Sequence, residues 1–322
     1  MTRFRHKAII AAVAALALTL AGCGLGGQEE KKSSVEAGSV DPTALKGATL
    51  IVGSKDFDEQ LLLGQMTIQM LSAAGAEVED KTNIQGSTAT RNALKSGKID
   101  VYWDYSGTGW ITYLGHDKPI ADEQGQYEAV RYEDLEKNGL VWGDLSPFNN
   151  TYAFATTEEF AADNNLETLS DMADYVNSND DVTVCVESEF TARPDGLPGV
   201  VKTYGMDLPT SKTQKLGTGV VYTQLDKGTC DFGEVFTTDG RIAALGLKPL
   251  EDDKLFFPLY NGAVVLTEET NEKYPEILEV LKPLSEKLTT ETMAALNAEV
   301  SSKGLPPKTV AQTYLLEQGF IK

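Results

Sequence analysis

Two segments of the chain share one pattern, and this repeat limits the folds that the chain can adopt. They are ALKSGKIDVYWDYSGTG, residues 93–109, and QLDKGTCDFGEVFTTDG, residues 224–240. Each combines a helix end, a glycine suited to a left-handed helix terminus, a buried strand and an aromatic residue at the strand's carboxyl end. Ligands of open parallel sheets bind beyond those strand ends. Unless the match is a coincidence of common residues, we expect the two rings, Tyr105 and Phe236, to face one cleft.

Strand-like and helix-like segments alternate along most of the chain. The alternation begins at ATLIVGS, restarts after Phe148 and ends in a helical tail. Alternating units of this kind predict an α/β protein whose lobes are each a mainly parallel sheet flanked by helices. We expect residues 47–150 and 259–322 to form lobe 1 and residues 151–258 to form lobe 2.

The first residues have the features of an export signal. Three basic residues precede an apolar run, residues 8–20, that ends in the letters LAGC. The run is too short for a comfortable bilayer span, and it resembles a bacterial lipoprotein signal, residues 1–22, cut before Cys23. A plain signal peptide or a short buried helix are the alternatives. Residues 23–46 are rich in Gly, Ser and charge, which predicts a flexible tether.

The charge balance and the missing motifs exclude several classes of function. The net charge is −20, and a phosphate backbone is bound through Lys and Arg stripes, so nucleic acid is not an expected partner. The acidity is explained by solubility outside the cell or by attraction of a cationic ligand. The sequence has no HExxH, GxSxG, SxxK or GxxxxGK[ST] motif, so we expect no enzyme, metal or cofactor. The letters DFDE, residues 56–59, predict a helix start with a capping box from Asp56 to Glu59.

Two cysteines remain once Cys23 is assigned to lipidation. Cys185 and Cys230 would lie in an oxidising compartment, where a disulfide can form. Two buried thiols would give the same sequence, so both states stay open here.

The chain resembles the substrate-binding lipoproteins of ABC importers for osmoprotectants such as glycine betaine, choline and carnitine. The likeness runs from about Leu50 to Phe320. It rests on several long motifs in one order: GSKDFDEQLLLGQ, LKSGKIDVYWDYSGTG, NNTYAFA, EFTARPDGLPGV, KTYGM, TDGRIAALGLKPLEDDKLFFPLYNGAVV and LNAEV.

This resemblance implies a type II periplasmic-binding-protein fold with the ligand cleft between the lobes. The family's aromatic cage matches Tyr105, Tyr152, Phe236 and Tyr260. Its carboxylate-holding positions match Lys55, Thr108 and Arg193, and Asn150 falls where a polar residue near the cage is usual. Phe236 departs from the Tyr often found there, which keeps a ring face but loses a hydroxyl.

The chemistry of these residue types fits a quaternary amine. A trimethylammonium group has no N–H to donate, whereas aromatic faces attract it through their quadrupole. A carboxylate at the ligand's other end would suit a guanidinium, an ammonium and a helix N-terminus. Each position also has an ordinary alternative: a core ring, a solvated Lys55, or a salt bridge from Arg193 to Asp195 or Glu189.

We therefore expect a monomeric, extracytoplasmic binding protein, lipid-anchored to the outer face of the cell membrane through Cys23. Its partners would be a small quaternary ammonium ligand, glycine betaine or a related betaine, and the permease subunit of an ABC importer. A sensory receptor and an enzyme on the same fold are the alternative classes. Glycine betaine, carnitine, choline, proline betaine and ergothioneine are the alternative ligands, with choline ranked lower because it lacks an acid.

Overall fold

The computed structural model describes residues 35–322. The predicted signal, Cys23 and the first part of the predicted tether lie outside the described residues. Among residues 35–322 there is no helix with both the length and the apolar character needed to cross a bilayer.

The first lobe is built on a five-stranded sheet of order β2-β1-β3-β10-β4, in which β10 runs against the other strands. Its strands are β1 (Thr49–Lys55), β2 (Glu77–Ile84), β3 (Val101–Tyr105), β4 (Leu140–Trp142) and β10 (Gly262–Thr267). Its helices are α1 (Asp58–Ala73), α2 (Ser87–Lys95), the π-helix η1 (Thr108–Tyr113), α3 (Glu123–Asn138), α9 (Glu268–Lys273), α10 (Glu276–Lys287), α11 (Thr290–Ser301) and α12 (Pro307–Glu317).

The second lobe repeats this topology. Its sheet has the order β7-β6-β8-β5-β9, with β5 antiparallel to β8 and β9. Its strands are β5 (Tyr152–Thr157), β6 (Val184–Glu187), β7 (Thr213–Leu216), β8 (Phe232–Phe236) and β9 (Leu247–Pro249). Its helices are α4 (Glu158–Asn164), α5 (Leu169–Ser178), α6 (Leu197–Tyr204), the 3₁₀ turn η2 (Thr210–Lys212), α7 (Thr218–Asp226) and α8 (Arg241–Ala244). The predicted fold class, two lobes of mainly parallel sheet flanked by helices, is confirmed.

Helices cover both faces of the first sheet. Successive residues of a strand face opposite sides, so each strand contributes side chains to both buried faces. Trp103 belongs to the apolar cluster that contains Met66 of α1, whereas its neighbour Tyr102 belongs to a second cluster with Val130 of α3. Both faces are thus buried, which explains why these strands read as continuous apolar runs.

The repeated segments take equivalent places in the two lobes. β3 and β8 are the middle strands of their sheets, and each follows a helix whose C-cap residue is followed by a glycine with positive φ, 69° at Gly97 and 64° at Gly228. Tyr105 and Phe236 are the last residues of these strands. The repeat therefore gives each lobe one ring at the carboxyl end of its middle strand.

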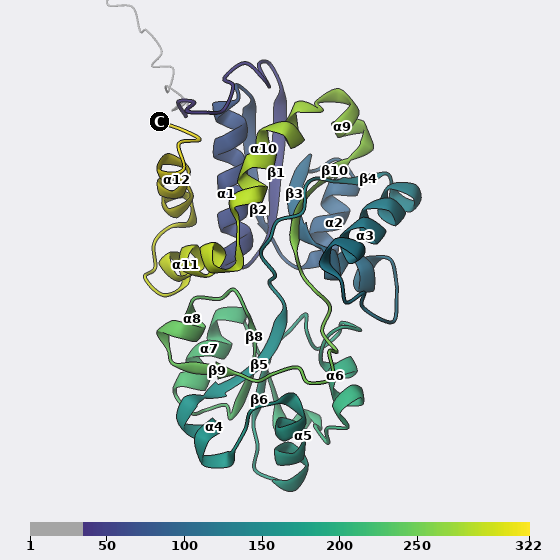
Figure 1. The fold of residues 1–322 in the computed structure, drawn as a ribbon, viewed down its shortest axis with the longest axis vertical. Helices are drawn as coiled ribbons and strands as arrows, with labels where there is room; N and C mark the ends of the chain where they lie inside the picture. Colours follow the sequence, from purple (N-terminus) through teal and green to yellow (C-terminus); the bar gives the residue numbers. More distant parts are fainter. Residues whose placement is uncertain (1–34) are drawn as a thin grey trace, which may run out of the picture. The chain divides into compact units, whose positions relative to one another are not determined.

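The chain passes between the sheets twice, just before β5 and just before β10 (Figure 1). The two crossing segments pair through an antiparallel bridge between Asn149 and Asn261. Tyr152 and Tyr260 lie at or beside these crossings, so both rings come close to the junction of the lobes.

Residues 35–46, which the sequence assigns to the flexible tether, pack against the first lobe instead. Ala37 pairs with Ile321 near the C-terminus, and Leu45 is only 2% exposed. The few apolar residues of this segment are scattered among Gly, Ser, Asp and Pro, which is why its composition resembles a linker.

Cys185 and Cys230 form a disulfide, with Cα atoms 5.8 Å apart. The bond links β6 to the residues just before β8, inside the second lobe. The disulfide is therefore the correct alternative of the two that the sequence left open.

Candidate functional site

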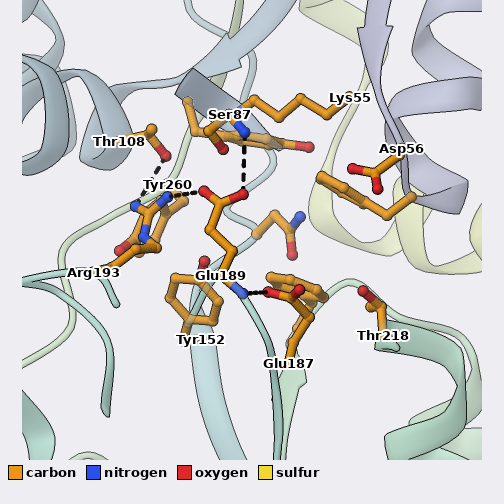
Figure 2. Close-up of a pocket in the computed structure, with 14 residues that line it drawn as sticks. Lys55, Asp56, Ser87, Thr108, Tyr152, Glu187, Glu189, Arg193, Thr218 and Tyr260 are labelled. Carbon is orange, nitrogen blue, oxygen red and sulfur yellow. Dashed lines mark hydrogen bonds and ion pairs between the residues drawn. The ribbon is translucent and has the colours of Figure 1, made fainter. Parts of the chain in front are cut away.

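A pocket lies between the lobes, and all eight residues that the sequence nominates line it. Its full lining is Lys55, Asp56, Phe57, Ser87, Tyr105, Thr108, Asn150, Tyr152, Glu187, Glu189, Arg193, Thr218, Phe236 and Tyr260. The empty space between the lining residues, its open mouth included, is about 560 Å³. Figure 2 shows the labelled side chains converging from both lobes.

The four predicted rings gather at this pocket. The Tyr152 ring centroid is 5.2 Å from those of both Phe236 and Tyr260, and the Tyr152 and Tyr260 rings meet edge to face. Tyr105 approaches the group through another ring, that of Phe57. Three of the four, Tyr105, Tyr152 and Tyr260, are at most 8% exposed, so their contact with a ligand would exclude most water.

Phe57 is a lining ring that the sequence interpretation missed. It stacks on Phe236 at 5.5 Å and on Tyr105 at 6.3 Å, which places it between the rings of the two repeats. The signal was present, because Phe57 also follows the carboxyl end of a buried strand, β1. It was overlooked because the letters around it suggest a helix cap.

That cap prediction is wrong. The residue at the N-cap of α1 is Phe57, without a side-chain cap, and Glu59 is buried. The Glu59 carboxylate accepts hydrogen bonds from Tyr105 Oη (2.8 Å), Asn150 Nδ2 (2.8 Å), Thr238 Oγ1 (2.6 Å) and Asn297 Nδ2 (2.8 Å). Burial raises its pKa, and three of these donors, all but Asn150, act in the opposite direction. Glu59 thus connects the Tyr105 ring and the first crossing segment to residues of both lobes.

Lys55 is not a solvated lysine. Its Nζ lies 2.7 Å from Asp104 Oδ1, and both side chains are almost fully buried, 3% and 0% exposed. The same Nζ is 5.0 Å from the centroid of the Tyr105 ring. Lys55 therefore faces the pocket as half of a buried ion pair rather than as a free ammonium.

Arg193 makes both of the salt bridges that the sequence offered as an alternative to ligand binding. Its Nε and Nη2 donate to Asp195 at 2.8 and 2.6 Å, and its Nη1 donates to Glu189 at 3.0 Å. A longer contact, 3.4 Å, joins Nη2 to Thr108 Oγ1 of the first lobe. Asp195 also accepts from Tyr260 Oη at 2.6 Å, so one hydrogen-bond network holds the guanidinium and the Tyr260 ring.

Acidic groups outnumber the basic ones around the pocket. Asp56, Glu187 and Glu189 line it together with Lys55 and Arg193, whose ion-pair partners Asp104 and Asp195 add two further carboxylates. A further acid behind the lining, Glu234 on β8, is buried, and burial raises its pKa to about 8, so it adds little negative charge at neutral pH. The surroundings therefore favour a cation over an anion.

The three tryptophans and His116 lie away from the pocket lining. Trp103 and Trp142 are core residues, at most 2% exposed, and Trp110 stacks on His116. Among residues 35–322 there is also no group of three or more His, Cys, Asp or Glu arranged to hold a metal ion.

Comparison with known proteins identifies relatives of this chain. Residues 48–317 match the family described as the substrate binding domain of ABC-type glycine betaine transport systems. A glycine-betaine-binding protein of Pseudomonas aeruginosa is 36% identical over 275 residues, which cover 84% of this chain and 88% of the relative. The carnitine transport binding protein OpuCC of Listeria monocytogenes is 30% identical over 277 residues, covering 85% and 88%.

Solved structures agree with this comparison. The crystal structure described as a glycine betaine/carnitine/choline ABC transporter has 30% sequence identity and a TM-score of 0.69, covering 84% of this chain and 99% of the other.

Proposed function

Because the chain belongs to the family of substrate binding domains of ABC-type glycine betaine transport systems, we propose that it captures a small quaternary ammonium compound. The ligand would be glycine betaine or a related betaine, held between the lobes and delivered to the permease subunit of an ABC importer. The protein would act by binding alone, without a chemical reaction.

The observation that carries this proposal is the convergence of aromatic rings from both lobes. Tyr105 and Phe57 come from the first lobe, Phe236 from the second, and Tyr152 and Tyr260 from the crossings. Each desolvated face contributes about 0.5–2 kcal/mol to a bound cation, so several faces together support roughly micromolar affinity after association costs.

Ligand capture would couple to closure of the lobes. Lys55, Tyr105 and Thr108 belong to one sheet and its following turn, whereas Arg193 and Phe236 belong to the other lobe. A ligand that touches both sets stabilises the closed arrangement, and the paired crossing segments near Asn149 and Asn261 are the natural hinge.

Membrane attachment through an acylated Cys23 completes the proposed role. A lipid anchor on the outer face of the cell membrane would keep the receptor near its permease. Cys23→Ala should release the protein from the membrane fraction without changing its affinity for ligand. Fractionation of cells, with calorimetry on the released protein, measures both outcomes.

A thermal-shift screen tests the binding function. Ligands that bind only the folded state raise the melting temperature. Glycine betaine, carnitine, choline, proline betaine and ergothioneine form the panel, and glycine is the matched control without methyl groups. We expect at least one quaternary amine to raise the melting temperature while glycine does not. No shift with any panel member up to millimolar concentration would contradict the proposal.

A further inference from the structure

The Glu189 carboxylate lies in the middle of the pocket and joins the two lobes (Figure 2). Glu189 follows β6 in the second lobe. Its Oε2 accepts a hydrogen bond from the Ser87 backbone N–H at 3.1 Å, and its Oε1 accepts from Arg193 Nη1 at 3.0 Å. Ser87 is the first residue of α2, in the first lobe.

These two donors are the types that bind a ligand's carboxylate. The backbone N–H groups at a helix N-terminus and a guanidinium both favour anions. The other pocket cation, Lys55, faces Asp104, and the Nε and Nη2 of Arg193 face Asp195. The protein's own carboxylates thus already pair with Lys55, with Arg193 and with the first backbone N–H of α2.

Glu189 is ionised in this position. Burial would raise its pKa, but Lys55, Arg193 and the hydrogen bonds from Ser87 outweigh burial and hold the pKa below its usual value. A ligand carboxylate that approached Ser87 and Arg193 would therefore meet a like charge at the same place.

Of the two carboxylates that bind Arg193, that of Glu189 is the one that a ligand can displace. Its side chain is 33% exposed and makes one contact with the guanidinium. Asp195, in contrast, is 2% exposed, binds Arg193 through both oxygens and accepts from Tyr260. Displacement of Glu189 breaks fewer interactions and exposes less buried charge.

On the basis of the proposed function, we propose that Glu189 is an internal competitor for the ligand's carboxylate and sets the preference between two classes of quaternary amine. A zwitterionic betaine binds after it displaces Glu189 from Ser87 and Arg193. A cation with a neutral tail, such as choline, binds with Glu189 in place and keeps its negative charge nearby. Removal of Glu189 should therefore favour betaines and disfavour choline.

Calorimetric titration of the wild type and of Glu189→Ala with glycine betaine and choline tests this inference. Both ligands carry trimethylammonium and differ in the carboxylate. The ratio of the dissociation constants, glycine betaine over choline, should fall by about tenfold or more in Glu189→Ala, because one like-charge contact disappears for one ligand only. Glu189→Gln should shift the ratio in the same direction by less, since its amide oxygen can still accept from Ser87.

Asp56→Asn is the matched control. Asp56 also lines the pocket and accepts from a backbone N–H near α2, that of Gly86 at 3.1 Å, but has no bond to Arg193. Its replacement removes the same charge without opening the anion-binding groups. The ratio should change by less than in Glu189→Ala, because Asp56 is exposed at the rim of the pocket and its removal leaves the contacts of Ser87 and Arg193 in place.

A ratio that is unchanged, or that rises, in both Glu189 variants would overturn the inference while the proposed function stands. An equal loss of affinity for glycine betaine and for choline would also overturn the inference, because Glu189 would then only hold the lobes together. If neither ligand binds any of the proteins, the proposed function fails and this inference fails with it. Glu189→Gln decides the question if Glu189→Ala shows no cooperative thermal transition.

Discussion

Replacement of Phe236 tests whether the rings hold the ligand. The Phe236 ring lies between those of Phe57 and Tyr152, at 5.5 and 5.2 Å, and is only partly buried. Its backbone N–H bonds to Tyr222 Oη, a contact that a side-chain change leaves in place. Loss of one cation–π face and of some buried apolar area should cost about 1–3 kcal/mol of binding free energy in Phe236→Ala, roughly 5- to 150-fold in affinity.

Two control variants separate the causes of that loss. Phe236→Leu keeps most of the apolar area without the ring face, so it should still lose about 0.5–2 kcal/mol of binding free energy. Phe232→Ala changes a fully buried ring on the same strand that packs edge to face against Phe160 and Tyr175. It should lower the free energy of unfolding by about 3–5 kcal/mol and leave the affinity of the folded protein unchanged.

Isothermal titration with the ligand found in the screen gives the affinities, and urea unfolding gives the stabilities. Unchanged affinity in Phe236→Ala would remove this ring from the site. Wild-type affinity in Phe236→Leu would show that buried apolar area, rather than the π face, accounts for the contribution of Phe236 to binding.

Three further changes test the disulfide of the second lobe and two buried groups near the pocket. Cys185→Ala with Cys230→Ala should lower the free energy of unfolding by about 2–4 kcal/mol, because the bond closes a loop of 45 residues; urea unfolding measures it, and equal stability would contradict this. Tyr105→Phe keeps the ring but removes one of four donors to buried Glu59, so unfolding free energy should fall by about 1–3 kcal/mol while affinity changes little. For Glu234, the native pKa of about 8 lies above the ordinary 4.5, so its stabilising contribution is complete below pH 4.5 and is lost as the pH rises through 8. Glu234→Gln should therefore raise the melting temperature relative to wild type more at pH 8 than at pH 5; a constant difference would be inconsistent with a raised pKa.

The rings could be predicted from the sequence because their placement follows from local rules. The repeat around Tyr105 and Phe236 carries its own helix end, glycine, strand and turn, and parallel sheets bring such strand ends together. The resemblance then added Tyr152 and Tyr260, which lie near the crossings. No long-range side-chain contact was needed for these positions.

The polar partners could not be predicted in the same way. The donors to Glu59 lie 46, 91, 179 and 238 residues away along the chain, so no local spacing marks it as a buried carboxylate. Lys55 and Asp104 are 49 residues apart, and Glu189 meets Ser87 over 102 residues. These pairs form only when the sheets assemble and the lobes meet.

The role of the rings can be measured most directly with one series of ligands that differ only in methylation. Glycine betaine, dimethylglycine, sarcosine and glycine keep the same carboxylate while the nitrogen loses its methyl groups one at a time. Calorimetry on the wild-type protein should show affinity falling at each step, with glycine unbound, because each lost methyl replaces contact with a ring face by a hydrated N–H. Equal affinity across the series, or tighter binding of glycine, would contradict selection of the ligand by the aromatic cage.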